Sequence, residues 1–236
     1  MVRGARPLYA VLIDADNIAA KFASAILKEI TALGEPALRR VYGDWSSGRL
    51  GNWAKEVRDL GLVAHQETAN TTGKNASDIG LVIDAMDILH TGRFDGFVLV
   101  SSDSDFTALA NRIREQGLDV IGIGEDKTPE SLRKVCNRFI LIENIIADDQ
   151  PQERGATVHA RKTPRDALPL ILKVMDKFPQ EDEWFSLGQI GQGLTAEYPD
   201  FDSRTYGKRK LSDLFAELKR FETRREGNSL LVRRVD

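Results

Sequence analysis

The chain has little of what several kinds of functional site require. Its 236 residues include one cysteine, Cys136, and three histidines. A single cysteine excludes an internal disulfide and a cysteine-rich zinc site, and so few histidines make a histidine-based metal site a poor candidate. Any metal chemistry must therefore depend on oxygen ligands, the ligands that Mg²⁺ prefers.

Long apolar runs and a strong net charge are also lacking. The apolar run 8–13 ends at Asp14 and is too short for a signal-peptide core or a membrane helix, so a cytoplasmic location with no membrane partner is the default expectation. The 33 basic and 36 acidic residues give a net charge of −3, which excludes a uniformly basic nucleic-acid coat but not a local basic patch. The hydrophobic content of 42% is typical of a folded protein, and the length suggests one or two domains.

Short apolar runs alternate with amphipathic stretches over residues 1–146. This alternation predicts an α/β fold, a parallel sheet with helices on both faces. A strand order of 3-2-1-4-5 would make the first and fourth strands neighbours at the point where the strand order reverses. The predicted strands are 8–13, 37–42, 62–66, 97–100, 120–123 and 139–142, and the predicted helices are 18–33, 50–60, 76–89 and 106–116.

The sequence pattern changes after residue 146. Residues 147–164 are polar, contain both Pro and Gly, and are interpreted as a linker. Residues 165–236 then form a smaller domain, with helices predicted at 167–178, 187–198 and 206–221 and a short strand at 230–232. Three helices with a terminal β-element predict a small winged-helix-like domain.

Carboxylates follow two of the predicted strands directly. Asp14 and Asp16 come after the first strand, Asp103 and Asp105 come after the fourth, and Asp78 lies in the first turn of the helix before the fourth strand. Ligands of open α/β sheets bind beyond the carboxyl ends of the strands, where these side chains would face one another. Converging carboxylates repel each other, and a hard divalent cation relieves that repulsion. The sequence therefore predicts a site for a hard divalent cation such as Mg²⁺ among these carboxylates.

Polar neighbours of these carboxylates complete the predicted site. Asn17 can orient a phosphate or a water molecule, Ser101 and Ser102 can hydrogen-bond the cluster, and Lys74 can balance phosphate charge. For any single residue, helix capping is an equally good explanation, because Asp and Ser are favoured at helix N-termini. Asp84 lies about 240° around the helix from Asp78 and is expected to leave the site for a solvated or ion-paired face.

The same residues carry a resemblance to a known family. The stretch 14–17 (Asp-Ala-Asp-Asn), the stretch 74–84 with its Lys, Ser and two Asp, and the stretch 101–106 (Ser-Ser-Asp-Ser-Asp-Phe) resemble the NYN domain, a branch of the PIN-like ribonucleases. The resemblance spans about residues 7–146. It implies a PIN-like sheet and a Mg²⁺ or Mn²⁺ site whose ligands are Asp14, Asp78, Asp103 and Asp105. Ser102 and Asn75 stand where the family often has Gly, and neither departure removes a carboxylate.

The second domain resembles the LOTUS domain, also called OST-HTH, over 201–215 and 231–234. Residues 203–234 hold ten basic and four acidic side chains, an excess that favours contact with a phosphate backbone. Tyr206 is a candidate for stacking on a base, although a place in the core is the alternative. The RNA-binding candidates in this domain are Arg204, Tyr206, Lys208, Arg209 and Lys210.

Three functions follow from these features. The first is a metal-dependent ribonuclease, expected to be an endonuclease, with single-stranded or structured RNA as its partner and Asp14, Asn17, Asp78, Asp103 and Asp105 as its catalytic residues. The second is a non-catalytic RNA- or protein-binding scaffold, with a protein partner for the C-terminal domain and a homodimer left open. The third is a haloacid dehalogenase-like phosphatase with Asp14 as nucleophile, ranked lower because no cap insertion is evident.

Overall fold

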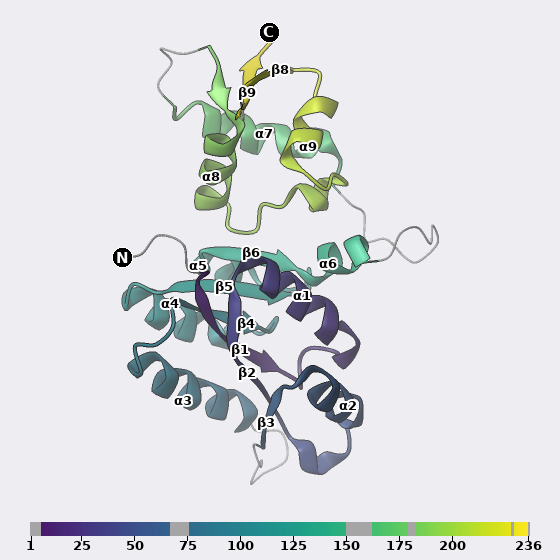
Figure 1. Cartoon of the computed structure of the whole chain (residues 1–236), viewed down its shortest axis with the longest axis vertical. Helices are drawn as coiled ribbons and strands as arrows, with labels where there is room; N and C mark the ends of the chain where they lie inside the picture. The colour runs from purple at the N-terminus through teal and green to yellow at the C-terminus, as the bar shows by residue number, and fades with distance from the viewer. Residues whose placement is uncertain (1–5, 67–75, 150–161, 179–182, 228, 236) are drawn as a thin grey trace. The chain divides into compact units, whose positions relative to one another are not determined.

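The structure of the chain is a computed structural model that describes residues 6–66, 76–149, 162–178, 183–227 and 229–235 (Figure 1). It divides into two compact units, Met1–Asp149 and Gln150–Asp236. The division into domains at 1–146 and 165–236 with a linker at 147–164 stays a proposal.

The first unit is built on a parallel sheet. Within the described residues, six strands lie in the order β3-β2-β1-β4-β5-β6, and each neighbouring pair is parallel. The strands are β1 (Leu8–Asp14), β2 (Glu35–Gly43), β3 (Val63–Gln66), β4 (Gly96–Val100), β5 (Asp119–Gly124) and β6 (Arg138–Leu141). The predicted adjacency of the first and fourth strands is confirmed, with Ile13 opposite Val100 in the register.

Helices cover both faces of this sheet, as the sequence predicts for a buried parallel sheet. One core cluster joins the sheet to α1 (Ala23–Leu33), α2 (Gly51–Leu60) and α6 (Ile142–Asp149). The opposite cluster joins it to α3 (Ala76–His90), α4 (Thr107–Glu115) and α5 (Glu130–Val135). Alternate residues of a strand point to opposite faces, so Val98 belongs to the first cluster while Phe97 and Leu99 belong to the second.

The alternation of side chains along a strand also determines which face of the sheet the polar residues at the strand ends lie on. Ile13 and Val100 pack in the core with α1, α2 and α6, so the next residues, Asp14 and Ser101, point to the face that α3 covers. Every residue of β4 is buried because the strand is central and covered on both faces. The fold thus carries Asp14 and Ser101 side by side to one edge of the sheet.

Gly124 allows β5 to approach that edge closely. A Cβ atom at this position would lie 2.7 Å from the carbonyl oxygen of Ser101 and 2.7 Å from the hydroxyl of Thr128. Real Cβ contacts are not this short, so a larger residue would push β5 away from the end of β4. The glycine is therefore explained by packing, and not by a nucleotide cofactor.

The second unit combines three helices with a small sheet. The helices are α7 (Pro164–Met175), α8 (Leu187–Glu197) and α9 (Leu211–Glu217), and the described strands β7 (Phe185–Ser186), β8 (Phe221–Glu226) and β9 (Ser229–Arg234) form an antiparallel sheet in the order β7-β9-β8. The helices and the end of β9 enclose one core that includes Ile171, Leu194, Phe215 and Val232. The predicted small domain of helices with a β-element is confirmed.

One predicted helix of this unit is wrong in its extent. The sequence predicts a helix over 206–221, whereas the chain forms a 3-10 turn at Ser203–Tyr206, the helix α9 and then β8. Gly207 has a φ of 75°, a left-handed conformation that interrupts a helix at little cost only for glycine. Phe221 belongs to β8, where it packs against Phe215 with ring centroids 4.7 Å apart.

Within the described residues, no helix is both long and apolar enough to cross a membrane.

Candidate active site

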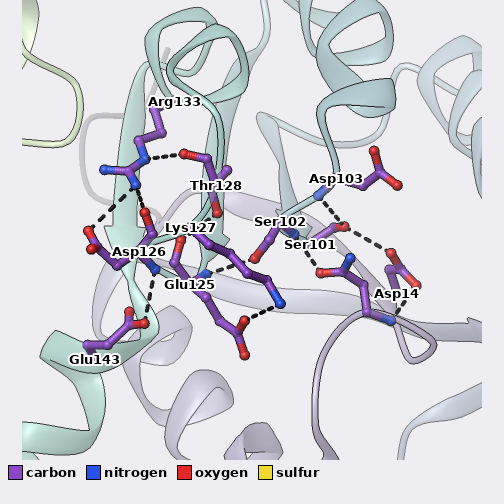
Figure 2. Close-up of polar contacts among 11 residues, drawn as sticks. Asp14, Ser101, Ser102, Asp103, Glu125, Asp126, Lys127, Thr128, Arg133 and Glu143 are labelled. Carbon is purple, nitrogen blue, oxygen red and sulfur yellow. Dashed lines mark hydrogen bonds and ion pairs between the residues drawn. The ribbon is translucent and has the colours of Figure 1, made fainter. Parts of the chain in front are cut away.

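The ends of β1 and β4 meet through a direct hydrogen bond. The hydroxyl of Ser101 donates to Oδ2 of Asp14 at 2.9 Å, and the same oxygen of Ser101 accepts a bond from the backbone N–H of Asp103 at 3.1 Å (Figure 2). Ser101 thus joins two predicted metal ligands that are far apart in sequence. Asp14 itself is buried, with 3% of its surface exposed.

Asn17 joins the same two loops a second time. Its backbone N–H donates to Oδ1 of Asp14 at 3.2 Å, and its side-chain oxygen accepts the backbone N–H of Ser102 at 2.9 Å. The side-chain oxygen is therefore used inside the protein, and the amide NH₂ is the part of Asn17 that can donate to a phosphate oxygen. Asn17 and Ser101 thus bond Asp14 directly, whereas the hydroxyl of Ser102 accepts the backbone N–H of Glu125 at 2.9 Å.

Burial and nearby carboxylates change the acidity of Asp14. Its pKa is raised from 3.8 to about 6. Burial is the largest cause, the charges of Asp78 and Asp16 also raise the pKa, and the hydrogen bonds from Ser101 and Asn17 lower it. A carboxylate in this position is costly to keep charged in the absence of a cation. Strongly perturbed acids of this kind gather at functional sites.

Asp78 shows that the carboxylates lie within electrostatic reach of one another. It lies in the first turn of α3, and its pKa is raised by burial and then by the charges of Asp103, Asp105 and Asp16. Asp103 is half-buried and its Oδ1 accepts the backbone N–H of Asp105 at 2.9 Å, so it also caps the turn that begins α4. Asp103 is therefore a cap, and its role as a metal ligand stays a prediction.

Asp16 is a member of this cluster that the sequence-based site leaves out. Its Oδ2 accepts a hydrogen bond from the hydroxyl of Ser77 at 3.0 Å, which ties the loop after β1 to the start of α3. Its charge contributes to the raised pKa values of both Asp14 and Asp78. The signal was the Asp-Ala-Asp sequence of 14–16, which places a second carboxylate in the turn that directly follows β1.

A further carboxylate of α3, Asp84, falls outside the cluster. Asp84 accepts hydrogen bonds from the guanidinium of Arg40 and from the hydroxyl of Tyr42, so it fastens α3 to β2 and is not a ligand, as expected from its position on the helix. Lys74 lies outside the described residues.

The oxygen donors of these side chains are of the kind that a divalent cation prefers, although the side chains are not arranged as a coordination shell. Among the described residues, no group of three or more His, Cys, Asp or Glu side chains is placed to hold a metal ion. The carboxylates of Asp14, Asp16, Asp78, Asp103 and Asp105 nevertheless influence one another, and the raised pKa of Asp78 records their repulsion. Oxygen ligands and mutual repulsion are what a hard cation needs and relieves, so the residues fit such an ion.

In the second unit, two of the predicted RNA-binding residues have structural roles. Tyr206 is 4% exposed and its ring packs 5.5 Å from that of Phe201, so its stacking face lies in the core and the prediction that it stacks on a base is wrong. Arg204 is held by Asp202 with a 2.7 Å ion pair, and both side chains are 12% exposed. These two residues therefore shape the loop before α9.

The three consecutive basic residues of the loop remain at the surface. Lys208 is half-buried and pairs with Glu217 at 3.1 Å, whereas Arg209 and Lys210 are exposed. Lys210 is the residue that precedes the first turn of α9. The structure thus separates a structural part of the predicted RNA surface, Arg204 and Tyr206, from an exposed part at 208–210.

Comparison with known proteins follows the same division of the chain. The family profile of the NYN domain matches residues 9–143, the segment that contains the sheet and all the carboxylates of the site. The chain belongs to the NYN domain family. The profile of the OST-HTH/LOTUS domain matches residues 161–232, so the NYN domain is followed by an OST-HTH/LOTUS domain.

Solved structures add a likeness in fold. A protein of unknown function from Vibrio parahaemolyticus is 20% identical, covers 61% of this chain and 98% of its own, and has a TM-score of 0.53. At that identity the likeness shows the fold alone. MurG from Acinetobacter baumannii is 11% identical, covers 89% of this chain and 70% of its own, and has a TM-score of 0.38, too low to support an argument. No curated protein matches the chain.

Proposed function

We propose that the chain is a metal-dependent ribonuclease that cleaves RNA phosphodiester bonds within the strand. The observation that carries the proposal is the convergence of the ends of β1 and β4 with the start of α3, which brings carboxylates from three parts of an NYN domain within electrostatic reach. The OST-HTH/LOTUS domain supports RNA as the substrate. The cytoplasmic location stays a prediction, and nothing in the described residues supports a homodimer.

The residues of the site have separate tasks in this proposal. Asp14, Asp78, Asp103 and Asp105 would hold Mg²⁺ or Mn²⁺, which when bound makes a water molecule more acidic and stabilises charge on the phosphate. Ser101 fixes the carboxylate of Asp14 through its 2.9 Å hydrogen bond.

Backbone anchors in the same loops limit movement of the site. The N–H of Ser101 donates to the carbonyl of Ile123, and the N–H of Ile18 donates to that of Asp14, both at 3.0 Å. Asn17 is therefore held with its amide NH₂ available to orient a phosphate oxygen. Holding reacting groups in place in this way contributes to catalysis by lowering the entropic cost of alignment.

Cleavage of a circular RNA tests the proposed activity directly. We expect turnover with Mg²⁺ or Mn²⁺ and loss of turnover when EDTA removes the metal, because the carboxylates need the cation to act on a phosphate. A circular substrate has no ends, so its cleavage also separates an endonuclease from an exonuclease. RNA binding without turnover under any divalent cation would contradict the proposal and favour the scaffold, and turnover of small phosphomonoesters instead of RNA would favour the phosphatase.

We also propose that the loop at 208–210 of the second unit contacts RNA. Replacing Arg209 and Lys210 together with Ala is expected to weaken binding of single-stranded RNA by about 10-fold. The slope of the logarithm of the binding constant against the logarithm of the salt concentration should become less steep by about 1.4, because each lost phosphate contact contributes about 0.7. The measurement is fluorescence anisotropy over a range of salt concentrations.

The matched control removes the same charge elsewhere in the unit. Lys173 on α7 and Lys177 just after it both pair with Glu197, and their double Ala variant should leave RNA binding nearly unchanged. Equal losses in the two double variants would indicate a non-specific charge effect. No loss in either would favour a protein partner for this domain.

A further inference from the structure

The loop after β5 reaches the same edge of the sheet as the acidic cluster. The backbone N–H of Glu125 donates to the hydroxyl of Ser102 at 2.9 Å, so this loop is bonded directly to the loop after β4. Adjacent strands lie about 4.8 Å apart, which places the end of β5 about one strand spacing from Ser101 and about two from Asp14. Figure 2 shows the side chains of Glu125 and Lys127 beside the residues that join β1 and β4.

The loop is held in a defined conformation by bonds on its other side. Thr128 donates its hydroxyl to the carbonyl of Glu125 at 2.6 Å, and Arg133 of α5 donates to the carbonyl of Thr128 at 2.7 Å. The N–H of Asp126 donates to the carboxylate of Glu143 on α6 at 3.0 Å (Figure 2). These hydrogen bonds to α5 and α6 hold the backbone of the loop, and therefore the positions of Glu125 and Lys127, in place.

Lys127 ends in an ion pair that is easily exchanged. Its ammonium lies 2.6 Å from Oε2 of Glu125, and the lysine side chain is 65% exposed while that of the glutamate is 27% exposed. Exposed ion pairs contribute only about 0–1 kcal/mol to stability, so this pair is not needed to keep the loop folded. A phosphate oxygen can therefore replace the carboxylate of Glu125 as the partner of Lys127.

The neighbouring carboxylates give this cation a role. RNA approaching Asp14, Asp78, Asp103 and Asp105 meets negative charge, which opposes a polyanion unless positive charge lies beside the site. Lys127 supplies such a charge from the loop after β5, the strand next to β4 in the sheet. Glu125 holds the ammonium in place until a phosphate competes for it.

We propose that Lys127 binds an RNA phosphate next to the one that is cleaved, and that Glu125 is its exchangeable partner in the absence of RNA. The inference rests on the proposed ribonuclease function and adds a substrate-binding site to it. It predicts opposite effects for the two partners. Loss of the lysine removes a phosphate contact, whereas loss of the glutamate charge removes the competitor of the phosphate.

The experiment compares Lys127→Ala and Glu125→Gln in the full chain, with a short single-stranded RNA as substrate. Lys127→Ala is expected to raise KM by about 5- to 10-fold with little change in kcat, as for loss of one charged hydrogen bond to substrate. In this variant, the slope of log kcat/KM against the logarithm of the salt concentration should become less steep by about 0.7. Glu125→Gln is expected to lower KM by about 2- to 3-fold, since the competing ion pair is weak.

Lys134 provides a matched control. It forms a 2.5 Å ion pair with Glu130 on α5, and both side chains are exposed, so Lys134→Ala removes the same charge from the same unit. We expect its KM to stay within about 1.5-fold of the wild type, as for a surface charge without a substrate contact. Equal KM values for Lys127→Ala and Lys134→Ala would overturn the inference, as would a rise in KM in Glu125→Gln.

Equilibrium RNA binding in EDTA separates this inference from the proposed activity. If the wild type binds RNA but does not cleave it with any metal, the ribonuclease proposal fails. Weaker RNA binding by Lys127→Ala than by Lys134→Ala would then still support the phosphate site. Equal binding by those two variants would overturn it as well.

Discussion

Replacing Asp14 with Asn is expected to abolish RNA cleavage and, at pH 7 without metal, to make the protein more stable. The loss of activity should reach about 10³-fold or more, because the carboxylate is a proposed metal ligand and metal assistance is worth several kcal/mol. The gain in stability follows from burial. Asp14 is 3% exposed, and its charge is costly in that position. A neutral amide of the same shape avoids that cost.

The pKa of Asp14 fixes the pH window of the stability effect. Since burial raises the pKa to about 6 from 3.8, the folded protein binds more protons than the unfolded chain between these values. The free energy of unfolding therefore falls as pH rises through this window, and the full penalty is present above about pH 6. A shift of this size corresponds to about 2–3 kcal/mol, an upper bound for the gain in Asp14→Asn.

Urea unfolding in EDTA at pH 7 and at pH 4 measures this effect. We expect Asp14→Asn to exceed the wild type by about 2 kcal/mol at pH 7 and by much less at pH 4, where the wild-type carboxyl is largely protonated. Asp87→Asn on the exposed side of α3 is the matched control and should show neither effect nor loss of cleavage. A variant that is less stable than the wild type at pH 7, or that still cleaves RNA, would contradict this account of Asp14.

Mn²⁺ should stabilise the wild-type NYN domain and not the Asp14→Asn variant. A cation bound only by the folded state stabilises it by about 2.7 kcal/mol at a concentration 100 times its dissociation constant. For a domain of this size that gain corresponds to a rise in Tm of about 5–10 °C. Burial and the charges of Asp103, Asp105 and Asp16 raise the pKa of Asp78, and a bound cation would relieve the repulsion among these carboxylates.

Thermal unfolding of both proteins with Mn²⁺ or with EDTA checks this expectation at matched ionic strength. The transition of the NYN domain should shift in the wild type and in Asp87→Asn, and hardly at all in Asp14→Asn. Equal shifts in all three proteins would mean that Mn²⁺ binds elsewhere.

The α/β unit was well predicted because its pattern is strong and local. Buried runs such as that of β4 and glycine stops after the helices mark each element, and right-handed crossovers leave few topologies to choose from. Once β1 and β4 are neighbours, Asp14 and Asp103 must approach one another. The approach of these strand ends could therefore be predicted from residues that directly follow strands.

Contacts that depend on side-chain packing were not visible in this way. Tyr206 is aromatic and flanked by basic residues, which suits both base stacking and a core, and only the packing against Phe201 decides between them. Strand β8 is polar and exposed apart from Phe221, so its sequence lacks the alternation that marks a strand. The bond between Glu125 and Ser102 joins two loops that no local pattern relates.

The most direct test of the central claim is the anomalous scattering of a crystal soaked in MnCl₂. The account predicts a peak beyond the carboxyl ends of β1 and β4, within about 2.0–2.3 Å of oxygens from Asp14 and from at least one of Asp78, Asp103 and Asp105. The same crystal form of Asp14→Asn should lack the peak. An empty site in the wild type at saturating Mn²⁺, or a peak that does not involve Asp14, would contradict it.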